Sequence, residues 1–272
     1  MTVPMTDDEL ALFRQFIGTT TGIELDASKR YLLEARLEAL LNSSDSKSYH
    51  ELFRRAKSAH DRSLEQAIVD AVSTHETSFF RDSKCFDLIR DKLVPDITSR
   101  RADKSIGIWS AACSTGQEAY SVAMSLHECL APGRPPPRVF GSDVSESSVA
   151  TARRGEYSSM EVNRGLDTRR INQHLVRTGE RYRIRDELRA LCTFEVDNLL
   201  SPHTRGPFDI ILCRNVLIYF SPSRQTEVVA LLLKRLAPHG AIIVGSTESL
   251  LGHSDRLVRH EHLSAAYYTL RP

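Results

Sequence analysis

An acidic residue and a small-residue loop are the first features of this sequence that suit a chemical function. Residues 106–111 form a short apolar run, the loop after it contains Gly116, and a helical pattern then begins. A strand, a tight loop and a helix start leave backbone N–H groups pointing outward, which favours negative ligand groups. A second run, residues 138–142, ends at Asp143, where a carboxylate can accept hydrogen bonds from both hydroxyls of a ribose. The spacing predicts a nucleoside half-site.

The loop between these elements indicates which nucleoside cofactor fits. A dehydrogenase typically carries Gly-x-Gly-x-x-Gly after the first strand, whereas residues 110–116 contain one glycine, so a pyrophosphate has little room to approach the backbone. A phosphate-binding P-loop is also absent. A ribose acceptor without a pyrophosphate cradle favours S-adenosylmethionine over NAD. Glu118 either interacts favourably with the dipole of the following helix or contacts the cationic methionine end of the cofactor.

The elements around this half-site alternate between strand and helix, which predicts a doubly wound, mostly parallel, Rossmann-like α/β sheet. A helix over residues 83–93 is expected to stop at Pro95. Residues 173–185 alternate around a glycine turn and predict a small antiparallel β insertion, about residues 170–187. Further strands are expected at residues 193–197, 208–213 and 241–244, and a last strand at the sheet edge over residues 265–270.

A small all-helical domain is expected to precede the sheet, over residues 1–73. Thr6 and Glu9 match a capping box, and apolar residues follow at helical spacing. A second helix, about residues 28–41, carries leucines on one face and basic residues elsewhere. By themselves these basic residues indicate a solvated helix face. They are Lys29, Arg30 and Arg36.

The two domains are joined by a segment that breaks the helical period, residues 74–82, which begins the larger domain, residues 74–272. Its adjacent aromatics, Phe79 and Phe80, suit a linker pinned against the second domain. Arg81 follows them, and on its own it is more typical of a structural ion pair than of catalysis.

Composition narrows the class of protein. There are 36 lysines and arginines against 35 aspartates and glutamates, a formal net charge of +1, which argues against a nucleic-acid binder with a basic face. Five scattered cysteines without a Cys-x-x-Cys pair predict reduced thiols and no metal site. The N-terminus shows no signal peptide, and no apolar run approaches a membrane span. We therefore expect a cytoplasmic protein that does not insert into the membrane.

Five motifs in order give the sequence a specific resemblance, which runs over nearly the whole chain. The motifs are Thr77-x-Phe79-Phe80-Arg81, residues 109–121 (Trp-Ser-Ala-Ala-Cys-Ser-Thr-Gly-Gln-Glu-Ala-Tyr-Ser), Ser142-Asp143, Asp197-Asn198-Leu199 and residues 213–220 (Cys-Arg-Asn-Val-Leu-Ile-Tyr-Phe). With these motifs the sequence resembles the CheR chemotaxis receptor methyltransferases, S-adenosylmethionine-dependent enzymes that esterify glutamate side chains on bacterial chemoreceptors.

The resemblance implies a set of functional residues. Asp143 would take the ribose hydroxyls, while Arg81 and Tyr219 would lie near the sulfonium as catalytic residues. His75 departs from the family, which usually has Asn there, but its ring can still donate one hydrogen bond. The cofactor contacts implied are His75, Thr77, Arg81, Glu118, Asp143, Asn198, Leu199, Arg214 and Asn215, with Asn198 and Leu199 flanking the adenine.

The implied chemistry needs little from the protein beyond positioning. A glutamate carboxylate has a reference pKa near ~4.3, so it is ionised and nucleophilic at neutral pH without a general base. The enzyme must hold it in line with the S–CH₃ bond and exclude water. Arg81 is the candidate for orienting the carboxylate and Tyr219 for shaping the transfer site, although a tyrosine in an apolar run is by default a core residue. S-adenosylhomocysteine would be the product.

The expected partner is the cytoplasmic helical domain of a chemoreceptor. In related proteins a basic N-terminal helix faces the acidic methylation helices, so Lys29, Arg30 and Arg36 become candidate docking residues. The hairpin resembles the subdomain that binds a receptor's C-terminal pentapeptide in some family members. Its turn over residues 177–181 is short and has one glycine, where pentapeptide binders have a longer glycine-rich loop. We therefore predict pentapeptide-independent recognition by a monomer.

Two other classes of function compete with this interpretation. N-methyltransferases often place Asn/Asp-Pro-Pro-Tyr/Phe after the fourth strand, but residues 214–219 contain no proline. A non-catalytic signalling adaptor would keep the fold and only bind partners. The presence of Asp143, Glu118, Arg81 and Tyr219 argues against an adaptor. Methylation of receptor glutamates for sensory adaptation remains the preferred hypothesis.

Overall fold

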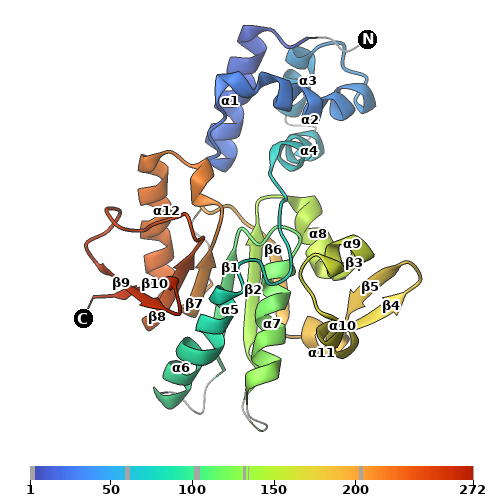
Figure 1. Cartoon of the computed structure of the whole chain (residues 1–272). Coiled ribbons are helices and arrows are strands. Elements are labelled where there is room, and N and C mark those ends of the chain that lie inside the picture. The colour runs from blue at the N-terminus through green and yellow to red at the C-terminus, as the bar shows by residue number, and fades with distance from the viewer. Residues whose placement is uncertain are drawn as a thin grey trace.

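The computed structural model describes residues 4–58, 62–100, 105–130, 133, 135–201 and 205–271. Its central element is a seven-stranded sheet in the order β6-β2-β1-β7-β8-β10-β9 (Figure 1). The strands are β1 (Gly107–Ala111), β2 (Arg138–Asp143), β6 (Cys192–Val196), β7 (Phe208–Cys213), β8 (Leu236–Val244), β9 (Leu257–His262) and β10 (Ala265–Leu270). The first five run parallel, and β10 is antiparallel to both β8 and β9. The predicted doubly wound, mostly parallel sheet is confirmed.

Helices cover both faces of the sheet, and its central strands are accordingly apolar at consecutive positions. In β1, Ile108 packs into one core and Trp109 into the other, as expected when successive side chains point to opposite faces. All six residues of β7 are buried. The covering helices are α5 (Lys84–Leu88), α6 (Val94–Arg100), α7 (Gln117–Cys129), α8 (Glu146–Arg154), α11 (Asp186–Arg189) and α12 (Pro222–Arg235), with α7 and α12 in opposite cores.

The prediction that a helix stops at Pro95 is wrong. A single π-helical turn (η2, Ile89–Leu93) follows α5, and the Val94 N–H donates to the Ile89 carbonyl five residues back. Pro95 is then the second residue of α6, within the first helical turn, where proline is tolerated. The wide turn therefore lets the helical segment continue to Arg100.

The prediction that residues 265–270 form the sheet edge is also wrong. This segment is β10, which lies between β8 and β9, and β9 is the edge strand. The sequence of β9 is mainly polar and its burial alternates between half-buried and exposed positions after Leu257. An edge strand of this kind has no apolar run, so apolar patterning did not detect it.

The predicted antiparallel insertion is confirmed as a separate three-stranded sheet. Its strands are β3 (Glu156–Ser158), β4 (Leu175–Thr178) and β5 (Arg181–Ile184), in the order β3-β5-β4, with α9 (Ser159–Asn163) and α10 (Thr168–His174) between them. The sequence predicted the β4–β5 hairpin. It did not predict β3, a three-residue strand that precedes both helices.

The N-terminal residues form the predicted all-helical unit. Thr6 and Glu9 make the expected capping box at the start of α1. Phe13, Leu37, Leu52 and Ile68, one from each long helix, meet in a separate core with no exposed surface. The elements are α1 (Asp7–Thr21), η1 (Ala27–Lys29), α2 (Arg30–Ser43), α3 (Tyr49–Ala56) and α4 (Arg62–Val72).

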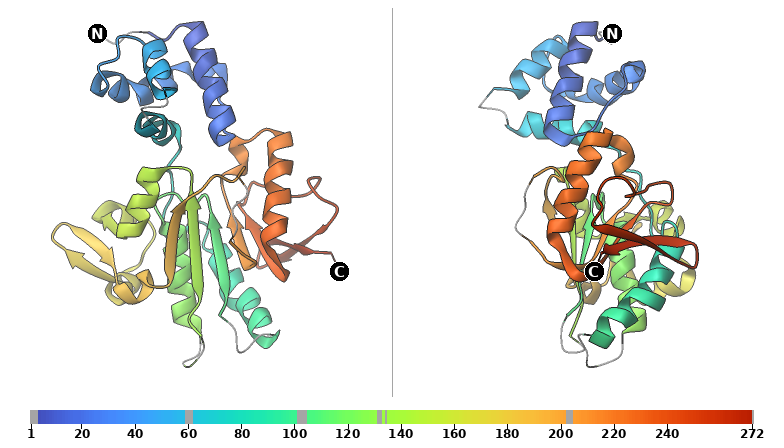
Figure 2. Two further views of the ribbon diagram at one scale, coloured as in Figure 1. Left: turned by 180° about the vertical axis from the view of Figure 1, so that it is seen from behind. Right: turned by 90° about the vertical axis from the view of Figure 1, so that its left-hand side faces the viewer.

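This N-terminal bundle lies beyond the carboxyl ends of the parallel strands, in both views of Figure 2. The end of α1 is joined to the sheet domain by two hydrogen bonds, from Asn198 Nδ2 to the Thr20 carbonyl (2.5 Å) and from the Glu24 N–H to the Tyr219 carbonyl (2.8 Å). Gly22 ends α1 with φ 80°, and a Cβ there would lie 2.5 Å from the Phe220 ring. Glycine is therefore required for both conformation and close approach. No helix in the described ranges is long and apolar enough to cross a bilayer.

Candidate active site

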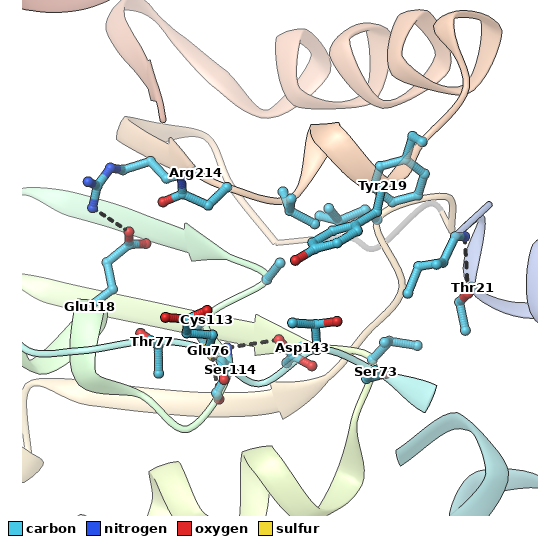
Figure 3. A pocket seen from close by; sticks show the side chains of 18 of the residues that line it. Thr21, Ser73, Glu76, Thr77, Cys113, Ser114, Glu118, Asp143, Arg214 and Tyr219 are labelled. Atoms are coloured by element: carbon cyan, nitrogen blue, oxygen red, sulfur yellow. Dashed lines mark hydrogen bonds and ion pairs between the residues drawn. The ribbon is translucent and has the colours of Figure 1, made fainter. Parts of the chain in front are cut away.

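A cavity opens at the carboxyl ends of β1, β2 and β7, under the N-terminal bundle (Figure 3). The strand order reverses between β1 and β7, the position at which open α/β sheets bind ligands. The empty space at this position is about 900 Å³, including the part that is open to solvent. Nine of the residues expected from the sequence line it: Thr77, Arg81, Glu118, Asp143, Asn198, Leu199, Arg214, Asn215 and Tyr219.

Asp143 ends β2 at the wall of the cavity. Its Oδ2 accepts a hydrogen bond from the Ser114 N–H (2.8 Å) and its Oδ1 one from the Ser145 N–H (3.0 Å). Burial raises the pKa of Asp143, and the two backbone donors only partly offset this rise. The carboxylate therefore fixes the loops after β1 and β2 relative to one another, and it keeps acceptor capacity for a ligand because an ionised carboxyl offers about four lone pairs.

The loop after β1 has the shape of a ligand cradle. Ala112 and Ser114 both have positive φ (58° and 50°), an uncommon conformation for residues other than glycine. Gly116 begins α7 with φ 94°, and a Cβ there would lie 2.8 Å from that of Ala152 on α8. The glycine thus allows α7 and α8 to approach closely behind the cavity.

The buried Arg214 forms an ion pair with the half-buried Glu118 at one end of the cavity (Figure 3). Glu118 Oε2 lies 3.0 Å from Arg214 Nη1, and its Oε1 accepts from the Ser110 hydroxyl (2.7 Å). Arg214 Nη2 donates to the Arg81 carbonyl and to Asp82 Oδ2, both at 2.8 Å. Burial lowers the pKa of Arg214, but nearby groups, including Glu118 and Asp82, raise it above its ordinary value overall. The charge of Arg214 is therefore neutralised within the protein.

Arg81 has different surroundings from Arg214. Its Nη1 donates to the Glu76 carbonyl (3.0 Å), and it forms no ion pair with a carboxylate of the described residues. The Glu76 carboxylate pairs with Arg164 (2.8 Å), and the Arg164 hydrogen bond and charge, together with the more distant Arg81 charge, lower the pKa of Glu76. Arg81 thus presents a half-buried guanidinium whose charge is available at the cavity.

Glu248 lies outside the cavity lining and supports a loop of this site, a role that the sequence did not predict. Its Oε2 accepts from the Asn215 N–H (2.6 Å) and the Gly245 N–H (2.8 Å), and its Oε1 from the Ile218 N–H (3.3 Å). Asn215 has φ 57°, so the loop that carries Asn215 and Tyr219 needs such support. No motif marks Glu248, because two of its three partners, Ile218 and Asn215, are 30 and 33 residues away in the chain.

Two other predicted cofactor residues have partners within the protein. Asn198 donates to the Thr20 carbonyl, and its Oδ1 accepts from the Leu200 N–H (2.9 Å), so its side chain joins the two domains at the cavity. His75 is absent from the cavity lining. Its ring lies 2.9 Å from the Asp70 carbonyl and 2.8 Å from the Ser148 hydroxyl, between α4 and α8.

The three predicted docking residues differ in their surroundings. Lys29 is exposed in η1. Arg30 forms an ion pair with Asp7, and Arg36 donates to the Val72 carbonyl where the linker begins. Within this bundle, Lys29 therefore presents its charge more openly than the two arginines.

The charges around the cavity suit a cationic ligand. Four carboxylates and two guanidinium groups contribute to its lining, so negative charge is in excess. The carboxylates are Glu76, Glu118, Asp143 and Asp197. No group of three or more metal-ligating side chains in the described ranges could hold a metal ion. The strand order, the carboxylate at the end of β2 and the position of the cavity define a Rossmann-like α/β protein with a nucleoside-binding site at the switch point of the sheet.

Comparison with known families identifies the group within this class. Residues 75–265 match the "CheR methyltransferase, SAM binding domain" and residues 8–73 the "CheR methyltransferase, all-alpha domain". The chain belongs to the CheR methyltransferase family, binds S-adenosylmethionine and is a methyltransferase of the chemotaxis type.

Similar proteins align along most of the chain. The "Chemotaxis protein methyltransferase 1" of Vibrio cholerae is 37% identical over 259 residues, which cover 93% of this chain and 94% of that protein. The "Chemotaxis protein methyltransferase" of Escherichia coli is 33% identical over 260 residues, 93% of this chain and 87% of that protein. Magnesium protoporphyrin IX methyltransferase from Synechocystis, solved with bound S-adenosylmethionine, aligns with a TM-score of 0.37 at 14% identity, over 85% of this chain and 93% of that one.

Proposed function

We propose that this protein methylates glutamate side chains of bacterial chemoreceptors, giving glutamate methyl esters for sensory adaptation and S-adenosylhomocysteine. Its chemotaxis relatives support the pathway, and the observation that carries the choice of acceptor is the contrast between the two arginines of the cavity. Arg214 is neutralised by Glu118 and Asp82, whereas Arg81 has no such ion pair in the described part of the chain. A cation in this state attracts an acceptor carboxylate, whereas it has no such charge attraction for the neutral amine that N-methylation requires.

The proposed reaction is a single displacement. A carboxylate oxygen of the acceptor forms a bond to the methyl carbon as the C–S bond breaks, and the electron pair of that bond stays on sulfur. Since the acceptor is already ionised at neutral pH, no proton has to be removed. The protein therefore contributes orientation, through Arg81 and Tyr219, and exclusion of water by the bundle that covers the cavity.

We assign the remaining cavity residues to the cofactor. Asp143 would accept from the ribose hydroxyls, and Asn198 and Leu199 would lie beside the adenine. Glu118 would face the cationic methionine end, held in place by Arg214. Thr77 and Asn215 would complete the contacts, while His75 would act from outside the lining.

The test uses labelled S-adenosylmethionine and a cytoplasmic fragment of a chemoreceptor from the same organism. We expect protein-bound label that mild base releases as methanol, as a carboxyl ester requires. Base-stable label would indicate nitrogen methylation and contradict the proposal. Bound cofactor without any transfer to receptor fragments would contradict it as well.

We also propose that the protein is a monomer and that its recognition of the receptor does not depend on a C-terminal pentapeptide. The hairpin turn between β4 and β5 has two residues, Gly179 and Glu180, because Thr178 pairs directly with Arg181. So short a loop offers little surface around a bound peptide. Docking would then depend on the N-terminal bundle, with Lys29 as its most accessible candidate cation. Titration with such a pentapeptide should give no saturable binding, and micromolar affinity would refute the idea.

A further inference from the structure

The last helix of the N-terminal bundle makes polar contacts with the turn that follows Asp143. Asp70 on α4 accepts hydrogen bonds from the first two N–H groups of α8: Oδ1 from Glu146 (2.9 Å) and Oδ2 from Ser147 (3.1 Å). Gln66, one helical turn earlier, donates to the Val144 carbonyl (3.0 Å) and lies 3.1 Å from Asp70 Oδ1. The N-terminal bundle therefore forms hydrogen bonds with three consecutive peptide units of the sheet domain.

These peptide units are next to the carboxylate expected to bind ribose. Asp143 forms a hydrogen bond with the same turn, since its Oδ1 accepts from the Ser145 N–H (3.0 Å). The Ser145 hydroxyl caps α8 by accepting from Ser148. The first N–H groups of a helix have no partner within the helix, so Asp70 supplies acceptors that α8 lacks. The turn is thus fixed by one carboxylate from each domain.

His75 adds a second connection between the same elements. Its ring bridges the Asp70 carbonyl and the Ser148 hydroxyl, and the Ser114 hydroxyl donates to the His75 carbonyl (3.4 Å). Ser114 is also the backbone donor to Asp143 Oδ2. The contacts therefore link α4, α8 and the loop after β1, the three segments around the Asp143 carboxylate.

We propose that Asp70 is a positioning residue for the cofactor, although it does not line the cavity. By holding the first turn of α8, it fixes the direction of the Asp143 carboxylate toward the ribose. The N-terminal bundle would then be part of the cofactor site, in keeping with Thr21 and Ile23 in the cavity lining. This inference concerns only the cofactor, so it is tested independently of the acceptor proposed above.

The experiment measures binding of S-adenosylhomocysteine to the full chain by calorimetric titration. Asp70→Ala should weaken binding roughly 3- to 30-fold, the equivalent of losing a strong helix cap. Asp70→Asn, which keeps one acceptor oxygen, should lie between wild type and Asp70→Ala. The matched control is Asp167→Ala, because Asp167 caps α10 by accepting from the Arg170 N–H (2.7 Å) and does not line the cavity. The control should lower thermal stability and leave the Kd unchanged.

A double-mutant cycle separates positioning from a general loss of stability. If Asp70 acts through Asp143, Asp70→Ala should have less than a twofold effect on the Kd in an Asp143→Ala background. Gln66→Leu gives a second route if Asp70→Ala does not fold, and it should weaken binding in the same direction. The proposal is overturned if Asp70→Ala, or Gln66→Leu in its place, binds within twofold of wild type. It is also overturned if its effect on the Kd is undiminished in the Asp143→Ala background.

Discussion

Replacement of Asp143 by alanine tests the cofactor site most directly. The carboxylate is buried at the end of β2, where it accepts one backbone N–H on each oxygen. Each oxygen has a further lone pair, which suits two ribose hydroxyls. The alanine variant removes these acceptors and loosens the loops that carry Ser114 and Ser145.

The size of the effect follows from the number of bonds lost. A hydrogen bond to a charged group is worth ~1.5–3 kcal/mol, so two bonds to the ribose give about 3–6 kcal/mol. At 1.4 kcal/mol per tenfold change, the Kd for S-adenosylhomocysteine should rise by roughly 10² to 10⁴. Loss of the two backbone hydrogen bonds adds to this rise in Kd, because the loops around the ribose are then less well positioned. A rise of roughly 10² is therefore the minimum that we expect.

Calorimetric titration measures this change, and the chain offers a matched control. Asp209 is a buried aspartate on β7, which β1 separates from β2, and it accepts from the Gly107 N–H (2.9 Å) at the start of β1. Asp209→Ala should therefore destabilise the fold without changing the Kd. If Asp143→Ala binds within threefold of wild type while remaining folded, the assignment of Asp143 to the ribose is refuted.

Three further predictions address other parts of the molecule. Arg81→Lys should lower the rate of methyl transfer on the order of 10- to 100-fold, because a lysine keeps the charge and loses the planar fork that orients a carboxylate; unchanged initial rates, with Arg224→Lys as control, would remove Arg81 from the transfer site. Glu248→Gln should lower kcat/KM about tenfold or more, since the amide nitrogen would face a backbone donor of the Asn215 loop, and a wild-type value would argue against this support. Arg170 and His174 bond Glu128 and, against the effect of burial, lower its pKa from 4.5 to about 2. An acid whose pKa is lowered in the folded state contributes stability that is present above pH 4.5 and lost as the pH falls toward 2. Glu128→Gln removes this titrating group, so the free energy of unfolding, measured by chemical denaturation, should fall less steeply between pH 5 and 3 than in the wild type.

The parts of the fold that could be predicted are those with a strong local signal. β7 is apolar at nearly every position because both faces of the sheet are covered, and residues 208–213 were expected as a strand on that ground. Asp143 could be placed beside the loop after β1 because the carboxyl ends of neighbouring parallel strands meet at one edge. The capping box at Thr6 and Glu9 likewise depends only on residues three apart.

The parts that could not be predicted depend on partners far away in the chain. Pro95 stays within a helical segment because a π turn changes the hydrogen-bonding pattern before it, and β9 forms because β10 provides a partner strand. Arg36 looks like a solvated helix cation in the sequence, but it donates to the Val72 carbonyl. Periodicity does not reveal such pairings, since each partner has an ordinary local sequence.

Contacts between residues far apart in the chain also explain why the sequence predicts a cofactor site confined to the larger domain. Every motif that indicated a nucleoside lies beyond residue 73, and the N-terminal helices appeared only as a candidate docking surface. In the structure α1 and its end contribute Thr21 and Ile23 to the cavity lining, and α4 bonds the turn after Asp143 through Asp70. A bundle that covers the cofactor and also meets the receptor would make docking and cofactor positioning depend on the same rigid unit. Placement of the bundle, and not only the reactive residues, would therefore set the geometry of methyl transfer.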